Sequence, residues 1–206
     1  MDATDLADTD PVTAASRVLG SILTVGEVRA RIVEVEAYGS PEDGPWPDPA
    51  AHSYPGPTPR NRVMFGPPGF LYVYLSYGIH RCVNVVCGPE NTACAVLLRS
   101  AEIIDGDDVV KARRPGVRRA GDFARGPGNL GKALGIELSD NGTDLFDPES
   151  TICLELRGAE TWETGPRVGV AKAADRPWRL WLPTSPAVST YRRSPRAPSS
   201  IGDVPA

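Results

Sequence analysis

The chain has 206 residues, 41% of them hydrophobic, and a formal net charge of -4 at pH 7. This length is typical of one domain, and this hydrophobic content is enough to bury a core. The acidic balance excludes a mode of nucleic-acid binding in which positive charge covers the whole molecule, but it permits a local basic face. The segment from Lys111 to Arg119, followed by Arg125, carries six of the 22 basic residues, and it is equally consistent with a solvated loop that binds nothing.

The four cysteines, which are Cys82, Cys87, Cys94 and Cys153, all lie in apolar runs. None of them has a C-x-x-C partner or a histidine at the spacing of metal ligands, so we expect core thiols and no metal site. The sequence shows no signal-peptide pattern and no run of about 18 apolar residues. We therefore expect no membrane association and a cytoplasmic location, close to the nucleoid if the source is a bacterium.

The first periodic pattern lies near the start of the chain. Residues 12–23 favour a short helix followed by the beginning of a strand, and residues 28–36 alternate between apolar and charged side chains, which predicts a half-buried strand. The alternation changes phase at Ile32 and Val33. A β-bulge would produce this change, and bulges often redirect side chains near active sites.

Three segments show no apolar periodicity. Residues 1–11 are therefore predicted to be a disordered tail and residues 189–206 a flexible C-terminal tail, which leaves a domain over residues 12–188. Residues 37–68 form a loop that is rich in Pro, Gly, Asp and Asn. Loops of this length inside a compact chain are usually functional or disordered.

The rest of the chain combines strand-like and short helical runs. Strands at 70–76 and 81–87, with a turn at 77–80 between them, predict a hairpin. Further strands are predicted at 93–104, 151–156, 167–171 and 179–182, and helices at 107–114 and 127–134, the second of which is capped by Gly135. The predicted fold class is α/β in the α+β sense, with a single domain built on a mixed, mainly antiparallel β-sheet with short helices.

Glu36 stands at the end of the first long strand, where the chain leaves the sheet for the loop. Position alone favours a carboxylate on the solvent face of an edge strand. Tyr38 has the same parity as Glu36, however, so the two side chains share a face, and the loop brings His52, one of only two histidines in the chain. A lone histidine is more often a structural residue, but the combination favours a site here.

Tyrosines are concentrated in the predicted hairpin, where Tyr72 and Tyr74 lie on one face of a strand. This stripe is compatible with an ordinary aromatic core. Tyr77 is harder to explain in that way, because it would be presented at the hairpin tip, followed by Gly78 and close to Arg81. An aromatic side chain at a tip can enter a base stack and hold open the space that an extruded nucleotide leaves.

Arginines accompany these aromatic residues. Arg60 and Arg62 lie in the segment Thr58-Pro-Arg-Asn-Arg62, where proline stiffens the loop. Such a loop is suited to phosphate contacts and equally to supporting a neighbouring site. We expect Arg60, Arg62 and Arg81 to serve one of these two purposes.

Seven ordered blocks between about Val18 and Leu182 make the chain similar to a known family. The blocks are RIVEVEAY, AAHS, TPRNRVMF, LYVYLSYG with Asn84 seven positions after Tyr77, AVLLR ending at Arg99, GPGNLGKALGI and RVGVAKAADRPWRLW. The chain in this respect resembles the alkyladenine, or 3-methyladenine, DNA glycosylases. The resemblance implies a single α/β domain similar to the C-terminal domain of methionyl-tRNA formyltransferase, with no metal or organic cofactor.

The resemblance also implies a role for each matched residue. Glu36 matches the general base that activates the attacking water and stabilises the charge on the sugar. Tyr38, His52 and Tyr74 match the pocket that sandwiches the flipped base, and Asn84 matches the residue that crowds the exocyclic amine of normal guanine. Purines alkylated at N3 or N7 are cationic, so aromatic faces would attract them by about 0.5 to 2 kcal/mol.

The matched residues around the base complete the site. Tyr77 matches the residue that intercalates into the duplex. Met64 and Leu97 match apolar residues near the displaced base stack. Arg99 matches an arginine that lines the pocket. The loop carries an insertion at residues 44–49 relative to the family, which bears on the placement of His52.

The implied activity is that of a monofunctional glycosylase of base excision repair. As a monomer on double-stranded DNA, it would release 3-methyladenine and 7-methylguanine, with hypoxanthine and ethenoadenine as further substrates, and leave an abasic site. Strand cleavage would need an amine nucleophile, and Lys111, Lys132 and Lys172 lie outside the stretches that form the pocket. Two alternatives are a non-catalytic DNA-binding module on the same fold and a hydrolase of free nucleosides, which would have no use for Tyr77 and Arg81.

Overall fold

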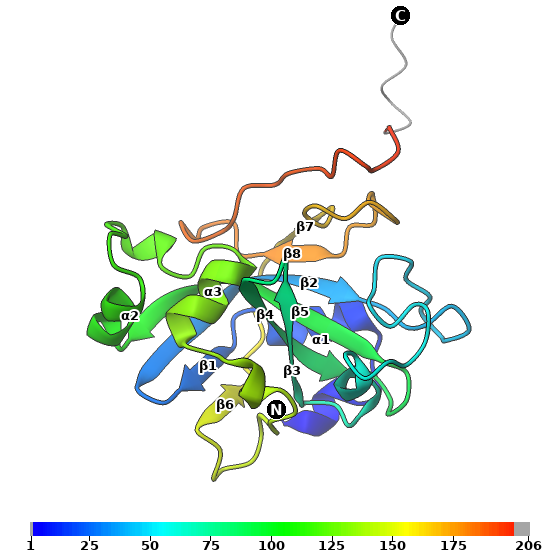
Figure 1. The fold of residues 1–206 in the computed structure, drawn as a ribbon, viewed down its shortest axis with the longest axis horizontal. Helices are drawn as coiled ribbons and strands as arrows, with labels where there is room; N and C mark the ends of the chain where they lie inside the picture. The colour runs from blue at the N-terminus through cyan, green and yellow to red at the C-terminus, as the bar shows by residue number, and fades with distance from the viewer. Residues whose placement is uncertain (1, 200–206) are drawn as a thin grey trace, which may run out of the picture.

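The computed structural model, described for residues 2–199, is built on one curled antiparallel β-sheet (Figure 1). Its strands are β1 (Ile22–Val25), β2 (Val28–Tyr38), β3 (Leu71–Ser76), β4 (His80–Cys87), β5 (Cys94–Asp105), β6 (Ile152–Glu155), β7 (Glu163–Gly165) and β8 (Arg179–Trp181). Its helices are α1 (Pro11–Val18), α2 (Asp107–Arg113) and α3 (Pro127–Leu134), with short 3-10 turns η1 (Ala3–Leu6), η2 (Arg62–Phe65), η3 (Ala120–Asp122) and η4 (Leu138–Asp140).

The strands follow the order β3-β4-β5-β2-β1-β6, and each pairing between named strands in the described part of the chain is antiparallel. Strand β2 organises the sheet, because β5 runs along one side of it while β1 and β8 share the other side. Strand β7 pairs with β8. The predicted fold class is confirmed, including the hairpin of β3 and β4.

The bulge predicted at Ile32 and Val33 is present. Ile32 faces Ala101 across the β2/β5 ladder, and Glu34 faces the preceding residue, Ser100, so that Val33 is skipped. Both Ile32 and Val33 are consequently buried, although they are neighbours. A second irregularity follows, because Val35 faces Leu98 and leaves Arg99 without a partner in register. The two bulges bring charged side chains of β2 and β5 together on one face of the sheet.

The opposite face of the sheet carries the hydrophobic core. Helix α1 is capped at its N-terminus by Asp10, whose carboxylate accepts the backbone N–H groups of Val12 and Thr13. Helix α3 is capped at its C-terminus by Gly135, which adopts the left-handed conformation with φ of 72°. The buried side chains of both helices join those of the central strands in one cluster. Figure 1 shows α2 and α3 beside each other on one side of the molecule and the long loop after β2 on the other.

Both predicted tails differ from the structure. Leu6 is fully buried in the core, and its carbonyl accepts the N–H of Gly88 at 2.8 Å, so the disorder predicted for residues 1–11 is wrong over η1 and the start of α1. Ser189 hydrogen-bonds to buried Glu34, so the flexibility predicted from residue 189 onward does not hold at Ser189 itself. Short polar segments give no periodic signal, and a few long-range contacts are enough to order them. Residues 200–206 lie outside the described part.

The strand predicted at residues 167–171 is also wrong. These residues form an irregular loop in which Arg167 is buried and Gly169 has φ of 72°. The apolar alternation of this segment fits a strand, but the N–H of Val168 is bonded to the side chain of Glu36 instead of a neighbouring strand. Strand β7, Glu163–Gly165, was missed because its residues, Glu, Thr and Gly, offer no apolar alternation. Within residues 2–199, no helix is long and apolar enough to cross a membrane.

Candidate active site

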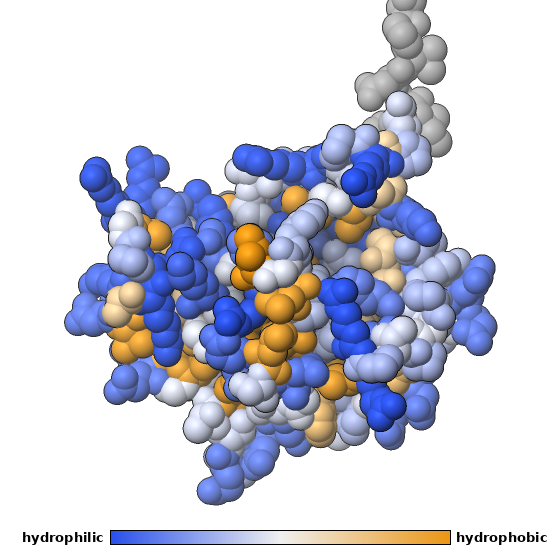
Figure 2. All heavy atoms as spheres, in the orientation of Figure 1, coloured by the Kyte–Doolittle hydropathy of each residue, from blue (hydrophilic) through white to orange (hydrophobic). Residues whose placement is uncertain are grey.

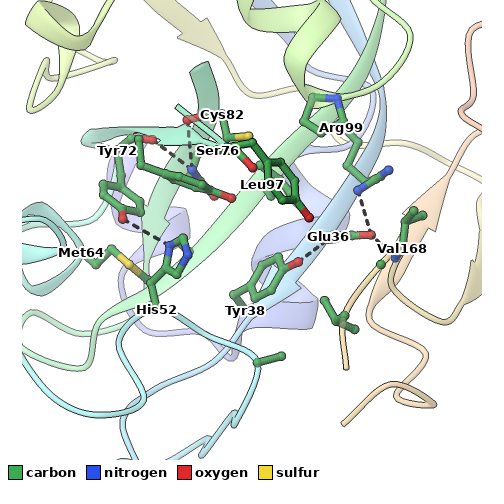
Figure 3. A pocket seen from close by; sticks show the side chains of 18 residues that line it. Glu36, Tyr38, His52, Met64, Tyr72, Ser76, Cys82, Leu97, Arg99 and Val168 are labelled. Atoms are coloured by element: carbon green, nitrogen blue, oxygen red, sulfur yellow. Dashed lines mark hydrogen bonds and ion pairs between the residues drawn. The ribbon is translucent and has the colours of Figure 1, made fainter. Parts of the chain in front are cut away.

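A pocket of about 380 Å³ opens on the sheet face that the core does not occupy (Figure 3). Its floor comes from β2, β3, β4 and β5, and its sides come from the loop after β2 and the loop before β8. Ten of the residues expected at the site line this pocket: Glu36, Tyr38, His52, Met64, Tyr72, Tyr74, Tyr77, Asn84, Leu97 and Arg99. The three arginines expected nearby, Arg60, Arg62 and Arg81, do not line it.

Glu36 is fully buried within the fold and borders the pocket, which contradicts the reading of an exposed edge-strand carboxylate. Its Oε1 accepts the backbone N–H of Val168 at 2.7 Å and lies 3.1 Å from Nη1 of Arg99, while its Oε2 accepts the hydroxyl of Tyr38 at 2.9 Å. These donors hold the carboxylate in one orientation. Oε2, which accepts only the Tyr38 hydroxyl among the described residues, keeps a further lone pair that can accept a proton from water.

Tyr38 is held against Glu36 by its hydroxyl, which stays protonated. Burial, together with the carboxylate of Glu36, raises the pKa of Tyr38 well above its usual value, so the phenol stays neutral and donates. The guanidinium of Arg167 lies 4.6 Å from the centre of the Tyr38 ring. Arg167 in turn forms a two-pronged ion pair with Asp48, at 2.6 and 2.9 Å, and both side chains are fully buried.

The Asp48 pair joins the two loops that flank the pocket. Asp48 belongs to the loop after β2, four residues before His52, and Arg167 immediately precedes Val168. Asp48 also accepts the backbone N–H of Gly39 at 3.1 Å. Residues 44–49, which the resemblance suggested to be an insertion, therefore supply an anchor through Asp48, and His52 reaches the pocket. Neither Asp48 nor Arg167 was identified from the sequence, because their separation of 119 residues gives no local signal.

An aromatic wall faces Tyr38 across the pocket. The rings of His52 and Tyr74 meet edge to face with centroids 4.5 Å apart, and Tyr72 Oη lies 3.4 Å from His52 Nδ1. Burial raises the pKa of Tyr72 to about 12 and also raises that of Tyr74. Burial lowers the pKa of His52, and nearby Arg60 adds to this effect, so the imidazole is neutral at pH 7. The wall is therefore uncharged and can stack on a planar ligand.

Asn84 has a fixed orientation beside this wall. Its Nδ2 donates to the carbonyl of Tyr72, its cross-strand partner, at 3.0 Å and to the carbonyl of Cys82 at 3.5 Å. The amide nitrogen is thus occupied by the backbone, and Oδ1 is the group left for a ligand. Met64 and Leu97, which are almost fully buried, close the floor nearby.

The hairpin between β3 and β4 ends in an exposed aromatic residue at the pocket rim. Tyr77 is 94% exposed and has a φ of 51°, a left-handed conformation that only a few per cent of non-glycine residues adopt. Ile79, two residues later, is 69% exposed. Figure 2 shows an apolar band at the centre of this face, over the hairpin, with hydrophilic side chains around it.

The predicted basic residues are used differently from one another. Arg60 lies 5.3 Å from the Tyr74 ring centre and donates to the carbonyl of Leu75 at 3.0 Å, so it supports the wall. Arg81 pairs with Glu137. Arg62 is exposed.

The basic run after β5 is largely occupied within the protein. Arg113 donates to the last carbonyls of α3, those of Ala133 and Leu134, at 3.1 and 2.7 Å. Arg114 bonds to Asn129, and Arg125 bonds to Pro186 and pairs with Asp122. Much of this run therefore supports the fold, and it does not form the uniformly solvated loop that the sequence allowed.

A second carboxylate lies directly behind Glu36. Glu34, which is fully buried, lies 2.9 Å from Nε of Arg99 and accepts hydrogen bonds from Ser100 Oγ at 2.7 Å and from the backbone N–H of Ser189 at 2.8 Å. Burial opposes its ionisation, but Arg99 and these hydrogen bonds outweigh burial and lower the pKa of Glu34. The alternation of β2 placed Glu34 on the same face as Glu36, yet nothing in the sequence marked it as buried.

Comparison with known proteins agrees with this geometry. The family model described as methylpurine-DNA glycosylase matches residues 5–186. The chain is 63% identical over 194 residues to a protein of Nocardia farcinica (93% of this chain, 92% of that protein) and 60% identical over 199 residues to one of Mycobacterium tuberculosis (97% and 98%). A protein of Rhodococcus jostii is 62% identical over 191 residues (93% and 86%).

Each of these relatives carries the provisional name 3-methyladenine DNA glycosylase. The family model covers most of the chain, and the relatives align with nearly all of it. The resemblance predicted from the seven sequence blocks is thereby confirmed, and with it a DNA substrate. The chain therefore belongs to the methylpurine-DNA glycosylase family of DNA repair enzymes.

Proposed function

We propose that this enzyme flips alkylated purines, with 3-methyladenine and 7-methylguanine as its main substrates, out of duplex DNA and hydrolyses their N-glycosidic bond. Hypoxanthine and ethenoadenine are further substrates in this proposal. The observation that carries it is Glu36, a carboxylate held at one end of an aromatic pocket by two hydrogen bonds, from Val168 and Tyr38, and by an ion pair with Arg99. A volume of about 380 Å³ lies within the usual range for small-molecule sites.

The first step is extrusion of the damaged nucleotide. Tyr77 stands at the rim of the pocket with almost all of its side chain in solvent, so it can enter the base stack without first leaving a packed position. Base flipping requires a few kcal/mol of unstacking and unpairing, and it requires least for a weakened pair. Part of the preference for damaged bases therefore arises before the base reaches the pocket.

The pocket then favours a cationic purine. The ring of Tyr38 and the wall of Tyr74 and His52 are neutral near pH 7 and can stack on a planar base. An alkylated purine with a positive charge gains about 0.5 to 2 kcal/mol from such aromatic faces. Asn84, whose amide is fixed on the Tyr72 carbonyl, restricts the space at the edge of the base.

Glu36 supplies the chemistry of hydrolysis. The bond between sugar and base breaks through an oxocarbenium-like state, and a nearby carboxylate both stabilises its positive charge and removes a proton from the attacking water. Oxygen from that water bonds to the anomeric carbon, and the bonding electrons leave with the purine. The product is an abasic site.

Strand cleavage is not part of the proposed reaction. A glycosylase that also cuts the strand needs an amine nucleophile near the anomeric carbon. The three lysines, Lys111, Lys132 and Lys172, are all within the described residues, and none of them lines the pocket. We infer a monofunctional enzyme that acts as a monomer.

Single-turnover base release tests this function. Duplexes with one hypoxanthine or one 7-methylguanine are incubated with excess wild-type protein, Glu36→Gln, or the control Glu42→Gln, whose side chain is exposed outside the pocket. We expect Glu36→Gln to bind the duplex but to release base about 10² to 10⁴ times more slowly, because glutamine cannot accept the proton. The control should match wild type.

Two results would contradict the proposal. If wild type binds DNA but releases no base, the chain is a non-catalytic binding module. If it releases base equally well from free nucleosides, duplex DNA and the Tyr77 hairpin play no part in the reaction.

A further inference from the structure

The fold buries two carboxylates and two guanidinium groups in contact behind the pocket. Glu34 and Glu36 are fully buried, and Arg99 and Arg179 are 7% and 6% exposed. Arg179 Nε lies 2.9 Å from Glu34 Oε1, although its N–H is not directed at the oxygen. Buried ion pairs rarely add stability over apolar residues of the same size, so this arrangement calls for a role beyond stability.

Arg99 is shared between the two carboxylates. Its Nε lies 2.9 Å from Oε1 of Glu34, and its Nη1 lies 3.1 Å from Oε1 of Glu36. An arginine that faced Glu36 alone would stabilise the carboxylate strongly, and a strongly stabilised carboxylate is a weak base. The negative charge of Glu34 opposes this stabilisation, because like charges favour the uncharged form of each other.

We propose that Glu34 is a positioning residue that balances the charges of Arg99 and Arg179, and thereby keeps Glu36 basic enough to activate water. This role of Glu34 rests on the proposed function, in which Glu36 is the general base. Glu34 itself does not line the pocket. It acts through Arg99, which it holds against the catalytic carboxylate.

The other groups around Glu36 do not disturb this balance. The titratable or charged side chains near it or in its pocket come from every surrounding element: Glu34 and Tyr38 of β2, His52, Tyr72 and Tyr74 of β3, Tyr77 of the hairpin turn, Cys82 of β4, Arg99 of β5, Arg167, and Arg179 of β8. Burial keeps Tyr38, Tyr72, Tyr74, the thiol and the imidazole neutral. Arg167 is matched by Asp48. Removing the charge of Glu34 therefore leaves one uncompensated positive charge.

The test is the pH dependence of single-turnover 7-methylguanine release. This base is already cationic, so its departure needs no proton, and the acid limb of the profile reports the general base. For Glu34→Gln we expect the acid limb to move about one unit to lower pH and the plateau rate to fall by up to about tenfold, since a general base that is one unit weaker loses at most a factor of ten. Arg179→Gln removes a positive charge and should move the acid limb to higher pH.

Glu102→Gln is the matched control. Glu102 pairs with Arg31 at 2.7 Å across the same two strands, away from the pocket, so its profile should follow wild type. Folding of each variant is checked by thermal unfolding and by binding to lesion DNA. If Glu34→Gln does not fold, Arg179→Gln still decides the question through the direction of its shift.

The outcomes separate the role of Glu34 from the proposed function. A wild-type enzyme that releases no base contradicts the proposed function itself. An active wild type with an acid limb that stays in place in both variants, or moves in the same direction in both, overturns the role of Glu34 alone. Slower release without a pH shift would mean that Glu34 supports the structure only.

Discussion

At the residue scale, Tyr77 combines full exposure with a strained backbone. It is 94% exposed, has a φ of 51° and precedes Gly78, which is also in the left-handed region. An L-residue other than glycine loses about 1 to 2 kcal/mol in this conformation. Tyr77 makes little contact with the protein and has a strained backbone, which suggests selection for a contact outside the protein. The proposed contact is the base stack of the DNA.

Replacing Tyr77 should therefore change activity and stability in opposite directions. We expect Tyr77→Gly to leave the free energy of unfolding unchanged or raise it by about 1 kcal/mol, because glycine removes the backbone strain at no packing loss. Base release at low enzyme concentration should fall about ten- to a hundredfold, from the lost stacking of about 1 to 3 kcal/mol. Tyr77→Phe keeps the ring and should retain activity. Unchanged release by Tyr77→Gly would exclude intercalation.

At the element scale, the Asp48 and Arg167 pair connects the loop after β2 with the loop before β8. Nη1 and Nη2 of Arg167 each donate a hydrogen bond to one carboxylate oxygen of Asp48. Nη1 also donates to the carbonyl of Ala37 at 3.0 Å. The pair thereby places Val168, whose N–H is bonded to Glu36. One buried ion pair thus fixes the position of two irregular loops relative to each other.

Asp48→Asn should reveal how much this ion pair contributes to the free energy of unfolding and to the rate of base release. Loss of one partner leaves a buried charge without its match, so we expect the free energy of unfolding to fall by about 3 to 5 kcal/mol. Base release should also slow, because Val168 is no longer held on Glu36. Asp175→Asn, which breaks the exposed pair with Arg193, is the control and should leave denaturant unfolding unchanged. Equal effects of the two variants would show that burial of the Asp48 pair is unimportant.

At the scale of the whole molecule, the buried carboxylates set the response of the fold to acid. The pKa of Glu34 lies below its ordinary value of 4.5, because Arg99 and hydrogen bonds outweigh the effect of burial. The pKa of Asp48 lies below 3.8, because the hydrogen bonds and charge of Arg167 outweigh burial in the same way. A folded-state pKa that is lowered gives stability that is present above the unfolded value and is lost as the pH falls through the folded value.

We therefore expect the free energy of unfolding to be constant near neutral pH and to decline progressively once the pH drops below about 4.5. Denaturant unfolding between pH 7 and pH 3 measures this decline. Asp48→Asn should show a shallower slope in the acid range, since one of the responsible carboxylates is gone. A wild-type stability that stays constant down to pH 3 would contradict the assigned directions.

The local pattern of apolar and polar residues was sufficient to predict most of the helices and strands. The alternation in β2, its change of phase at Ile32 and Val33, the hairpin around Tyr77 and the capping of α3 by Gly135 were all predicted and are present. These features depend on backbone preferences and on which side chains alternate, and both are properties of neighbouring residues. Matching blocks added Glu36, Tyr38, His52 and Tyr74, which do line one pocket.

Only the tertiary structure decided which charges are buried and what they pair with. Glu34 and Glu36 follow the same alternation as an exposed edge strand would, yet both are buried, because β5, β8 and the loop before β8 cover them. The partner of Asp48 lies 119 residues away, and the bond that shows why residues 167–171 are not a strand joins Val168 to Glu36 over 132 residues. The sequence by itself thus determined most of the strands, the hairpin tip and the family. Pairing of buried charges was decided by the fold, because it depends on contacts between distant segments that leave no period in the sequence.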